Sequence, residues 1–158
     1  FLFEATVLLF ICMILQDQVK LFSYLGLLPF ILVPIVAWIS PETAYSNKLI
    51  EFFYSWSTLM FAFMTGTFWI LALRNNKNIS TAVALFTLLF VAMTSFYSLE
   101  MINPIIFLIS LLILYELGYL YEKKFIKDME WYKNLRFYLT FSIRICHLLM
   151  IAFIFTNQ

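Results

Sequence analysis

Charged residues are scarce in this sequence of 158 residues, because Asp, Glu, Lys and Arg together make up only 12% of it. A soluble domain of this size usually carries about 25% charged residues. Histidine occurs once, cysteine twice and glycine three times. These low counts argue against a metal cluster built from His and Cys, a disulfide framework and a glycine-rich phosphate loop. The net charge is only +1 and no basic face stands out in the sequence, so we expect no nucleic-acid partner.

Hydrophobic residues are abundant, at 64% of the chain, and they occur in long runs. Because a helix needs about 20 apolar residues to cross a bilayer, these runs predict membrane-spanning helices. The candidate runs are residues 1–16, 21–38, 52–73, 81–97, 104–121 and 137–155. The sequence therefore predicts an all-α, polytopic membrane bundle of five core transmembrane helices within residues 21–158. A separate helix over residues 1–16, which is short and contains Glu4, either spans the bilayer as a sixth or lies at its surface.

The basic residues are distributed unevenly between the two predicted sides. The five segments that connect successive runs lie alternately on the two sides of the predicted membrane. Connections two and four contain one basic residue, Lys48. The three odd-numbered connections together hold Lys20, Arg74, Lys77, Lys123, Lys124, Lys127, Lys133 and Arg136. By the positive-inside rule, we expect these connections to face the cytoplasm of a bacterium or the matrix of a mitochondrion.

Two charged residues, Glu116 and Arg144, and the single histidine, His147, lie inside the last two apolar runs. Counted at 1.5 Å per residue from the basic side, Arg144 is roughly 10 Å deep and Glu116 roughly 7 to 8 Å deep. Since an unpaired charge near the bilayer centre costs about 2.5 to 3.5 kcal/mol, we predict that Glu116 and Arg144 pair. His147, one turn deeper on the face of Arg144, is expected to face protein as well.

Thr65 and Thr67 of the third run reach similar depths, which predicts a polar layer shared with Glu116, Arg144 and His147. The preferred interpretation is that this layer holds the helices in register. An alternative is a proton or ion relay, because ionisable groups inside membranes often mark transport pathways. Ligation of haem or a metal by His147 is the weakest interpretation. We expect no catalytic residue, cofactor or metal site.

Two further groups of residues are candidates for contacts. Gly26, Gly66 and Gly118 are predicted to be points of close helix packing, with Gly118 facing the sixth run. The segment between the fifth and sixth runs mixes charges with large apolar side chains. Its members Lys123, Lys124, Lys127, Trp131 and Arg136 are candidates for a surface that docks a partner or an anionic lipid.

Three segments give the chain a family resemblance. The segments "LGLLPF" (25–30), "AFMTGTFWILAL" (62–73) and "EWYKNLRFYLT" (130–140) resemble, in order and spacing, the transmembrane protein 69-like family, also called domain of unknown function 3429. The matching residues are Gly26, Pro29, Gly66, Trp69, Trp131, Tyr132 and Arg136. The chain departs from the family in its central segment, where Thr65, Phe68 and Ile70 replace a glycine, a polar residue and a glycine. The resemblance implies a small helical protein of bacterial inner membranes and mitochondria, and it implies no activity.

These observations favour a non-enzymatic function. We expect an accessory or assembly subunit of a larger inner-membrane complex, with a respiratory complex as the leading candidate. Its partners would be membrane lipids and other integral membrane subunits. The alternative is a small carrier or proton-conducting protein that uses the polar layer.

Overall fold

The computed structural model of the protein describes residues 2–76, 78–97, 103–126 and 130–157, with side chains from residue 16 onward. The helices in these residues are α1 (Leu2–Ile39), α2 (Pro41–Ser46), α3 (Leu49–Arg74), α4 (Ser80–Tyr97), α5 (Pro104–Lys123) and α6 (Glu130–Thr156). Within α1 the segment Gln16–Ile39, and α3, α4, α5 and α6 as wholes, are each long and apolar enough to cross a membrane. The predicted all-α membrane bundle with five core helices is confirmed.

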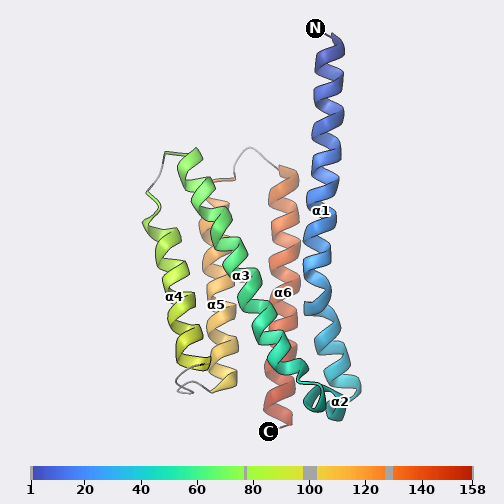
Figure 1. Ribbon diagram of the computed structural model, residues 1–158, viewed down its shortest axis with the longest axis vertical. Coiled ribbons are helices and arrows are strands. Elements are labelled where there is room, and N and C mark those ends of the chain that lie inside the picture. Colours follow the sequence, from blue (N-terminus) through green and yellow to red (C-terminus); the bar gives the residue numbers. More distant parts are fainter. Residues whose placement is uncertain (1, 77, 98–102, 127–129, 158) are drawn as a thin grey trace.

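The first helix differs from the prediction. We expected a helix over residues 1–16 that is separate from the next one, but α1 runs without interruption from Leu2 to Ile39. The residues at the expected break are "QDQVK" (16–20), which contain neither glycine nor proline, so no residue there stops a helix. The 38 residues of α1 would span about 57 Å, nearly twice the roughly 30 Å of a bilayer core. The helix accordingly continues well beyond the ends of its neighbours (Figure 1).

Local sequence signals explain how two of the other helices begin. The Asn103 side chain accepts a hydrogen bond of 2.9 Å from the backbone N–H of Ile105, and Pro104 occupies the first helical position. This is the N-cap arrangement that the Asn-Pro pair predicts. After α1, Pro41 begins the short helix α2, which turns the chain back into α3.

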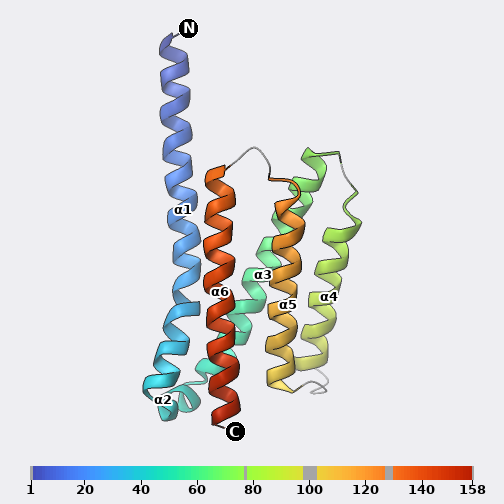
Figure 2. The ribbon, with the colours of Figure 1, turned by 180° about the vertical axis from the view of Figure 1, so that it is seen from behind.

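The core of the bundle is rich in aromatic rings. α6 packs between α1 and α5, and α3 crosses the bundle in contact with α1, α4 and α5 (Figures 1 and 2). Large side chains that are almost completely buried fill the space between these helices, among them Phe30, Phe53, Phe61, Phe68, Phe107, Tyr115 and Phe153. The C-terminal ends of α3 and α5 and the N-terminal ends of α4 and α6 lie at one end of the bundle, and the chain ends at the other (Figure 2).

Candidate functional site

The predicted ion pair between Glu116 and Arg144 is confirmed. Nε and Nη2 of Arg144 in α6 each lie 2.6 Å from Oε1 of Glu116 in α5. The pair lies at the outer edge of the contact between these helices, because the Arg144 and Glu116 side chains remain 40% and 33% exposed. The expectation that Arg144 faces protein therefore holds only in part. Each charge neutralises the other, which lowers the cost of holding both at the depth of a bilayer.

His147 is completely buried, as expected, and both of its ring nitrogens have partners. Nδ1 lies 2.9 Å from the carbonyl oxygen of Ile143, one turn earlier in α6. Nε2 lies 2.8 Å from the hydroxyl of Ser57 in α3. Since a carbonyl oxygen only accepts, Nδ1 must donate to it, which leaves Nε2 of a neutral ring to accept from Ser57. The phenol of Tyr115 in α5 donates to the carbonyl oxygen of Ser57 at 2.8 Å, so this cluster connects three helices.

A serine hydroxyl beside a histidine is also the arrangement of an activated nucleophile. Here, however, Ser57 and His147 are both 0% exposed. The rings of Phe53 and Phe30 lie against the imidazole, with centroids 5.2 and 5.8 Å from it. No space remains for a substrate carbonyl next to the hydroxyl. The contact therefore fixes the position of α3 against α6. It could not be found from sequence, because 90 residues separate the two.

Hydrogen bonds among the described residues do not join the members of the predicted polar layer into one network. Thr65 and Thr67 donate to carbonyl oxygens of their own helix, those of Ala62 and Met64, both at 2.7 Å. Among the residues that the structure describes, no hydrogen bond connects the pair of Glu116 and Arg144 with His147. The physical reason is helical geometry, since neighbouring residues on α5 point about 100° apart. Tyr115 thus faces the core while Glu116 faces outward.

A second ion pair, which the sequence reasoning missed, lies closer to the basic end of the bundle. Glu122 in α5 is 1% exposed, and its Oε2 lies 2.5 Å from Nε of Arg136 in α6. Its other oxygen, Oε1, accepts a hydrogen bond of 2.9 Å from the phenol of Tyr132. The Arg136 side chain is only 11% exposed, so it does not form part of an openly exposed docking surface with the neighbouring lysines.

A sequence signal for this second pair existed. α5 and α6 are antiparallel, so a step forward along α5 matches a step backward along α6. Glu122 lies six residues after Glu116, and Arg136 lies eight residues before Arg144, so the sequence repeats the glutamate and arginine at matching steps along the two helices. Both pairs therefore lie along the same seam between α5 and α6, one at the outer edge and one inside.

The remaining members of the predicted surface have mixed positions. Lys123 and Lys124 are exposed, as a docking or lipid surface requires, and Trp131 is partly buried. Lys127 lies outside the described residues. Whether this surface binds a partner stays a prediction.

The three glycines differ in their surroundings. A Cβ added at Gly118 would lie 3.0 Å from Phe68 Cζ, so this glycine is a close-packing point, but its neighbour is α3 and not α6. A Cβ at Gly26 would lie 3.5 Å from Met60 Sδ, an ordinary contact, so this glycine lies at the interface of α1 and α3. A Cβ at Gly66 would meet nothing within 4 Å, and Gly66 is exposed, so it does not serve the predicted packing role.

Within the described part of the chain, no group of three or more His, Cys, Asp or Glu residues could hold a metal ion.

The family model described as "Protein of unknown function (DUF3429)" matches residues 15–152. This match confirms the resemblance to the domain of unknown function 3429 and does not address the name transmembrane protein 69-like. No curated protein and no solved structure matches the chain.

Proposed function

The chain belongs to the DUF3429 family of unknown function, and we propose that it is a non-enzymatic integral membrane subunit that packs against a larger inner-membrane complex. A respiratory complex is the leading candidate for that partner. The observation that carries the proposal is the length of α1. This helix continues past the bundle, and no other helix among the described residues lies beside its extension (Figures 1 and 2).

The sequence of the extension explains why a partner is favoured. Residues 2–15, "LFEATVLLFICMIL", hold a single charge, that of Glu4. Burial of apolar surface is favourable by about 25 cal/mol per Å², so a helix of this composition gains stability from a protein or lipid that covers it. Because Gln16–Ile39 is by itself long enough to span the bilayer, a membrane-embedded partner that rises beyond the bilayer would cover the extension best.

The interior of the bundle supports a structural function. Several of its buried polar groups form contacts between helices, as in the cluster of Ser57, Tyr115 and His147 and the pair of Glu122 and Arg136. Such groups fix the register of the helices. The outer faces of the helices are apolar, which suits lipid and helix contacts.

A crosslinking experiment tests this proposal. A photoreactive amino acid is placed at Leu9 in the α1 extension and, as the matched control, at Ile113, an outward-facing residue of α5 that is 53% exposed. After irradiation of native membranes, we expect Leu9 to crosslink to a protein much larger than the chain and Ile113 to crosslink mainly to lipid. Blue native electrophoresis in mild detergent should show the chain in the same large complex. Monomeric migration together with lipid-only crosslinks at Leu9 would refute the proposal.

The membrane and the orientation are part of the same proposal. By the positive-inside rule, the basic ends of α3, α5 and α6 would face the matrix of a mitochondrion or the cytoplasm of a bacterium. Since residue 2 lies at the same end of the bundle, α1 would extend on that side. Single cysteines introduced at Lys124 and Asn157, in a background without Cys12 and Cys146, should react with an impermeant thiol reagent from opposite sides.

The carrier function stays the alternative prediction. It receives less support than the subunit function, because the described residues give no hydrogen-bonded connection between Glu116 and His147. Proton flux into liposomes containing the purified protein would favour it, provided that Glu116→Gln or His147→Ala abolishes the flux.

A further inference from the structure

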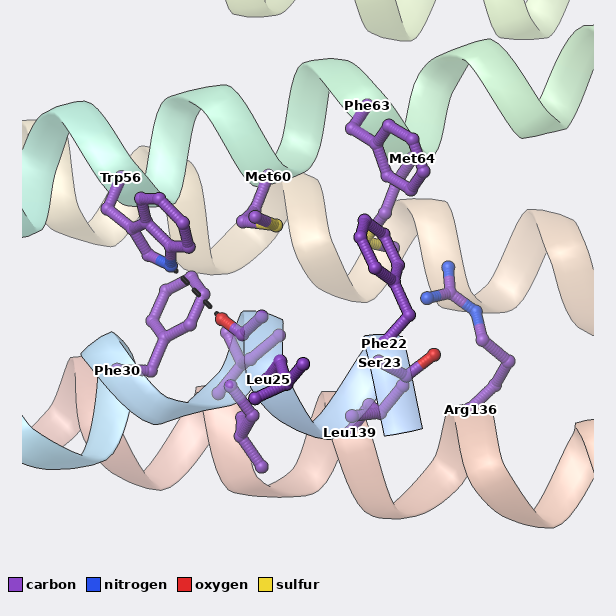
Figure 3. A pocket seen from close by; sticks show the side chains of 13 residues that line it. Phe22, Ser23, Leu25, Phe30, Trp56, Met60, Phe63, Met64, Arg136 and Leu139 are labelled. Atoms are coloured by element: carbon purple, nitrogen blue, oxygen red, sulfur yellow. Dashed lines mark hydrogen bonds between the residues drawn. The ribbon is translucent and has the colours of Figure 1, made fainter. Parts of the chain in front are cut away.

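A half-enclosed cavity of about 250 Å³ lies between α1, α3 and α6 (Figure 3). Phe22, Leu25 and Phe63 line it and are 65%, 52% and 59% exposed, so they form its rim. The cavity therefore opens on the outer side of the bundle, where the bilayer would lie. Its inner wall includes Phe30 and Met64, which are buried. The cavity exceeds the roughly 150 Å³ that holds one benzene molecule in a protein core.

Two polar side chains, those of Ser23 and Arg136, interrupt this apolar wall. Arg136 extends from α6 with its guanidinium directed toward Phe22 and Met64 (Figure 3). Its Nε is bonded to Glu122, but its Nη2 is buried and has no hydrogen-bond partner among the described residues. Because the Arg136 side chain also lines the cavity, its guanidinium can donate to an acceptor that enters the cavity at this end.

The charge of the site selects the kind of acceptor. Glu122 already neutralises Arg136, and together they add no net charge to the cavity wall. An anionic group would lose its hydration on entering the cavity, and no unpaired positive charge there would compensate for that cost. An uncharged carbonyl oxygen satisfies the N–H without that cost.

The depth of the site indicates where such a carbonyl comes from. The 27 residues of α6 span about 40 Å, close to the full thickness of a bilayer with its headgroups. Arg136 lies six residues after the first residue of α6, about 9 Å from that end, near the boundary between headgroups and hydrocarbon. The cavity continues to Ile143, about 10 Å deeper into the hydrocarbon. Ester carbonyls of glycerolipids lie at this boundary, with their acyl chains below them.

We propose that the cavity binds one acyl chain of a diester glycerophospholipid, whose ester carbonyl accepts a hydrogen bond from the guanidinium of Arg136 where it lines the cavity. The acyl chain lies against Met60, Met64 and Leu139, and the rim phenylalanines flank its entrance. This inference goes beyond the proposed subunit function and does not depend on the identity of any partner protein.

Fluorescence of Trp56 provides the assay, because this side chain lines the cavity and its indole N–H is bonded to the carbonyl oxygen of Gly26 at 3.1 Å. In a background where Trp38, Trp69 and Trp131 are replaced by Phe, Trp56 is the only tryptophan. The purified full chain is delipidated in detergent and titrated with phosphatidylcholine that carries bromines on its acyl chains. We expect saturable quenching with one lipid per chain.

Unlabelled competitors then identify the recognised group. Diester phosphatidylcholine should displace the brominated lipid at a concentration about tenfold lower than its diether analogue, which lacks the carbonyl oxygens. Equal displacement by the two lipids would overturn the proposal. If oleate displaces the brominated lipid at a lower concentration than the diester lipid does, the proposal of an uncharged acceptor is refuted. If a short-tailed benzoquinone displaces it more strongly than the diester lipid, the ligand is a quinone and the lipid proposal is refuted.

Two sets of variants link the signal to the cavity. Gly26→Leu places a side chain in the cavity and should abolish the saturable quenching, whereas Gly66→Leu, the same change at an open position of α3, should leave it intact. The double variant Glu122→Gln with Arg136→Met keeps the cavity and leaves no buried charge, and it should lose the tenfold preference for the diester. If Gly26→Leu fails to fold, the double variant still decides, since a preference that persists in it refutes the function assigned to Arg136.

Discussion

Replacing Arg136 by methionine should destabilise the bundle strongly, because it leaves the Glu122 carboxylate without its counter-ion. Glu122 is 1% exposed, and its partner Arg136 is 11% exposed. Removing one partner of a buried ion pair costs about 3 to 5 kcal/mol, since the other charge stays desolvated. This cost is a large fraction of the roughly 5 to 15 kcal/mol by which an ordinary domain is stable. The hydrogen bond from Tyr132 to Glu122 compensates only a small part of the loss.

The assay is unfolding of the purified chain in mixed micelles with increasing sodium dodecyl sulfate, followed by circular dichroism. Lys133→Met is the matched control, because it removes an exposed cation from the same helix, one turn earlier. We expect this control to change the free energy of unfolding by at most about 0.5 kcal/mol. The double variant Glu122→Gln with Arg136→Met should recover most of the stability that Arg136→Met loses, because it buries no charge.

Two results would refute this reasoning. Equal loss of stability in Arg136→Met and Lys133→Met would mean that Arg136 is as exposed as Lys133. A double variant that is no more stable than Arg136→Met alone would mean that the two side chains are not coupled.

The buried contacts allow two further predictions. Gly118→Ala should destabilise the bundle by about 1 to 3 kcal/mol, because its new methyl group would press on aromatic rings of α3. Gly66→Ala, at an open position, should instead stabilise the bundle by about 0.5 to 1 kcal/mol. Thermal unfolding that ranks the two variants in the opposite order would contradict this packing. Ser57→Ala should cost about 1 to 3 kcal/mol because it leaves Nε2 of His147 buried without a donor, while Ser55→Ala on the exposed side of α3 should cost less than 0.5 kcal/mol. Similar losses for the two serine variants, measured by the same detergent titration, would show that the contact between Ser57 and His147 is not formed.

The apolar runs determined the membrane class, the five core helices and most of their ends. These features follow from local properties, namely run length, proline positions and the cap at Asn103, which are readable without tertiary structure. The pairing of Glu116 with Arg144 was also predictable, because consecutive antiparallel helices bring equal depths together. The continuity of α1 differs from the prediction, because the few polar residues at positions 16–20 indicate a connection although none of them stops a helix.

The direction in which each polar side chain points was decided only by the tertiary structure. Residues of one helix at similar depth point to different neighbours, so depth alone could not separate the outward pair of Glu116 and Arg144 from the enclosed His147. Arg136 illustrates the same limit, because its position in a basic segment indicated a surface, whereas the packing of α5 on α6 buried it against Glu122. The sequence determines which residues enter the membrane, since hydrophobic transfer depends on composition. The crossing of α1, α3 and α6 determines which of them line a cavity, since that depends on rotation and contact between helices far apart in the chain.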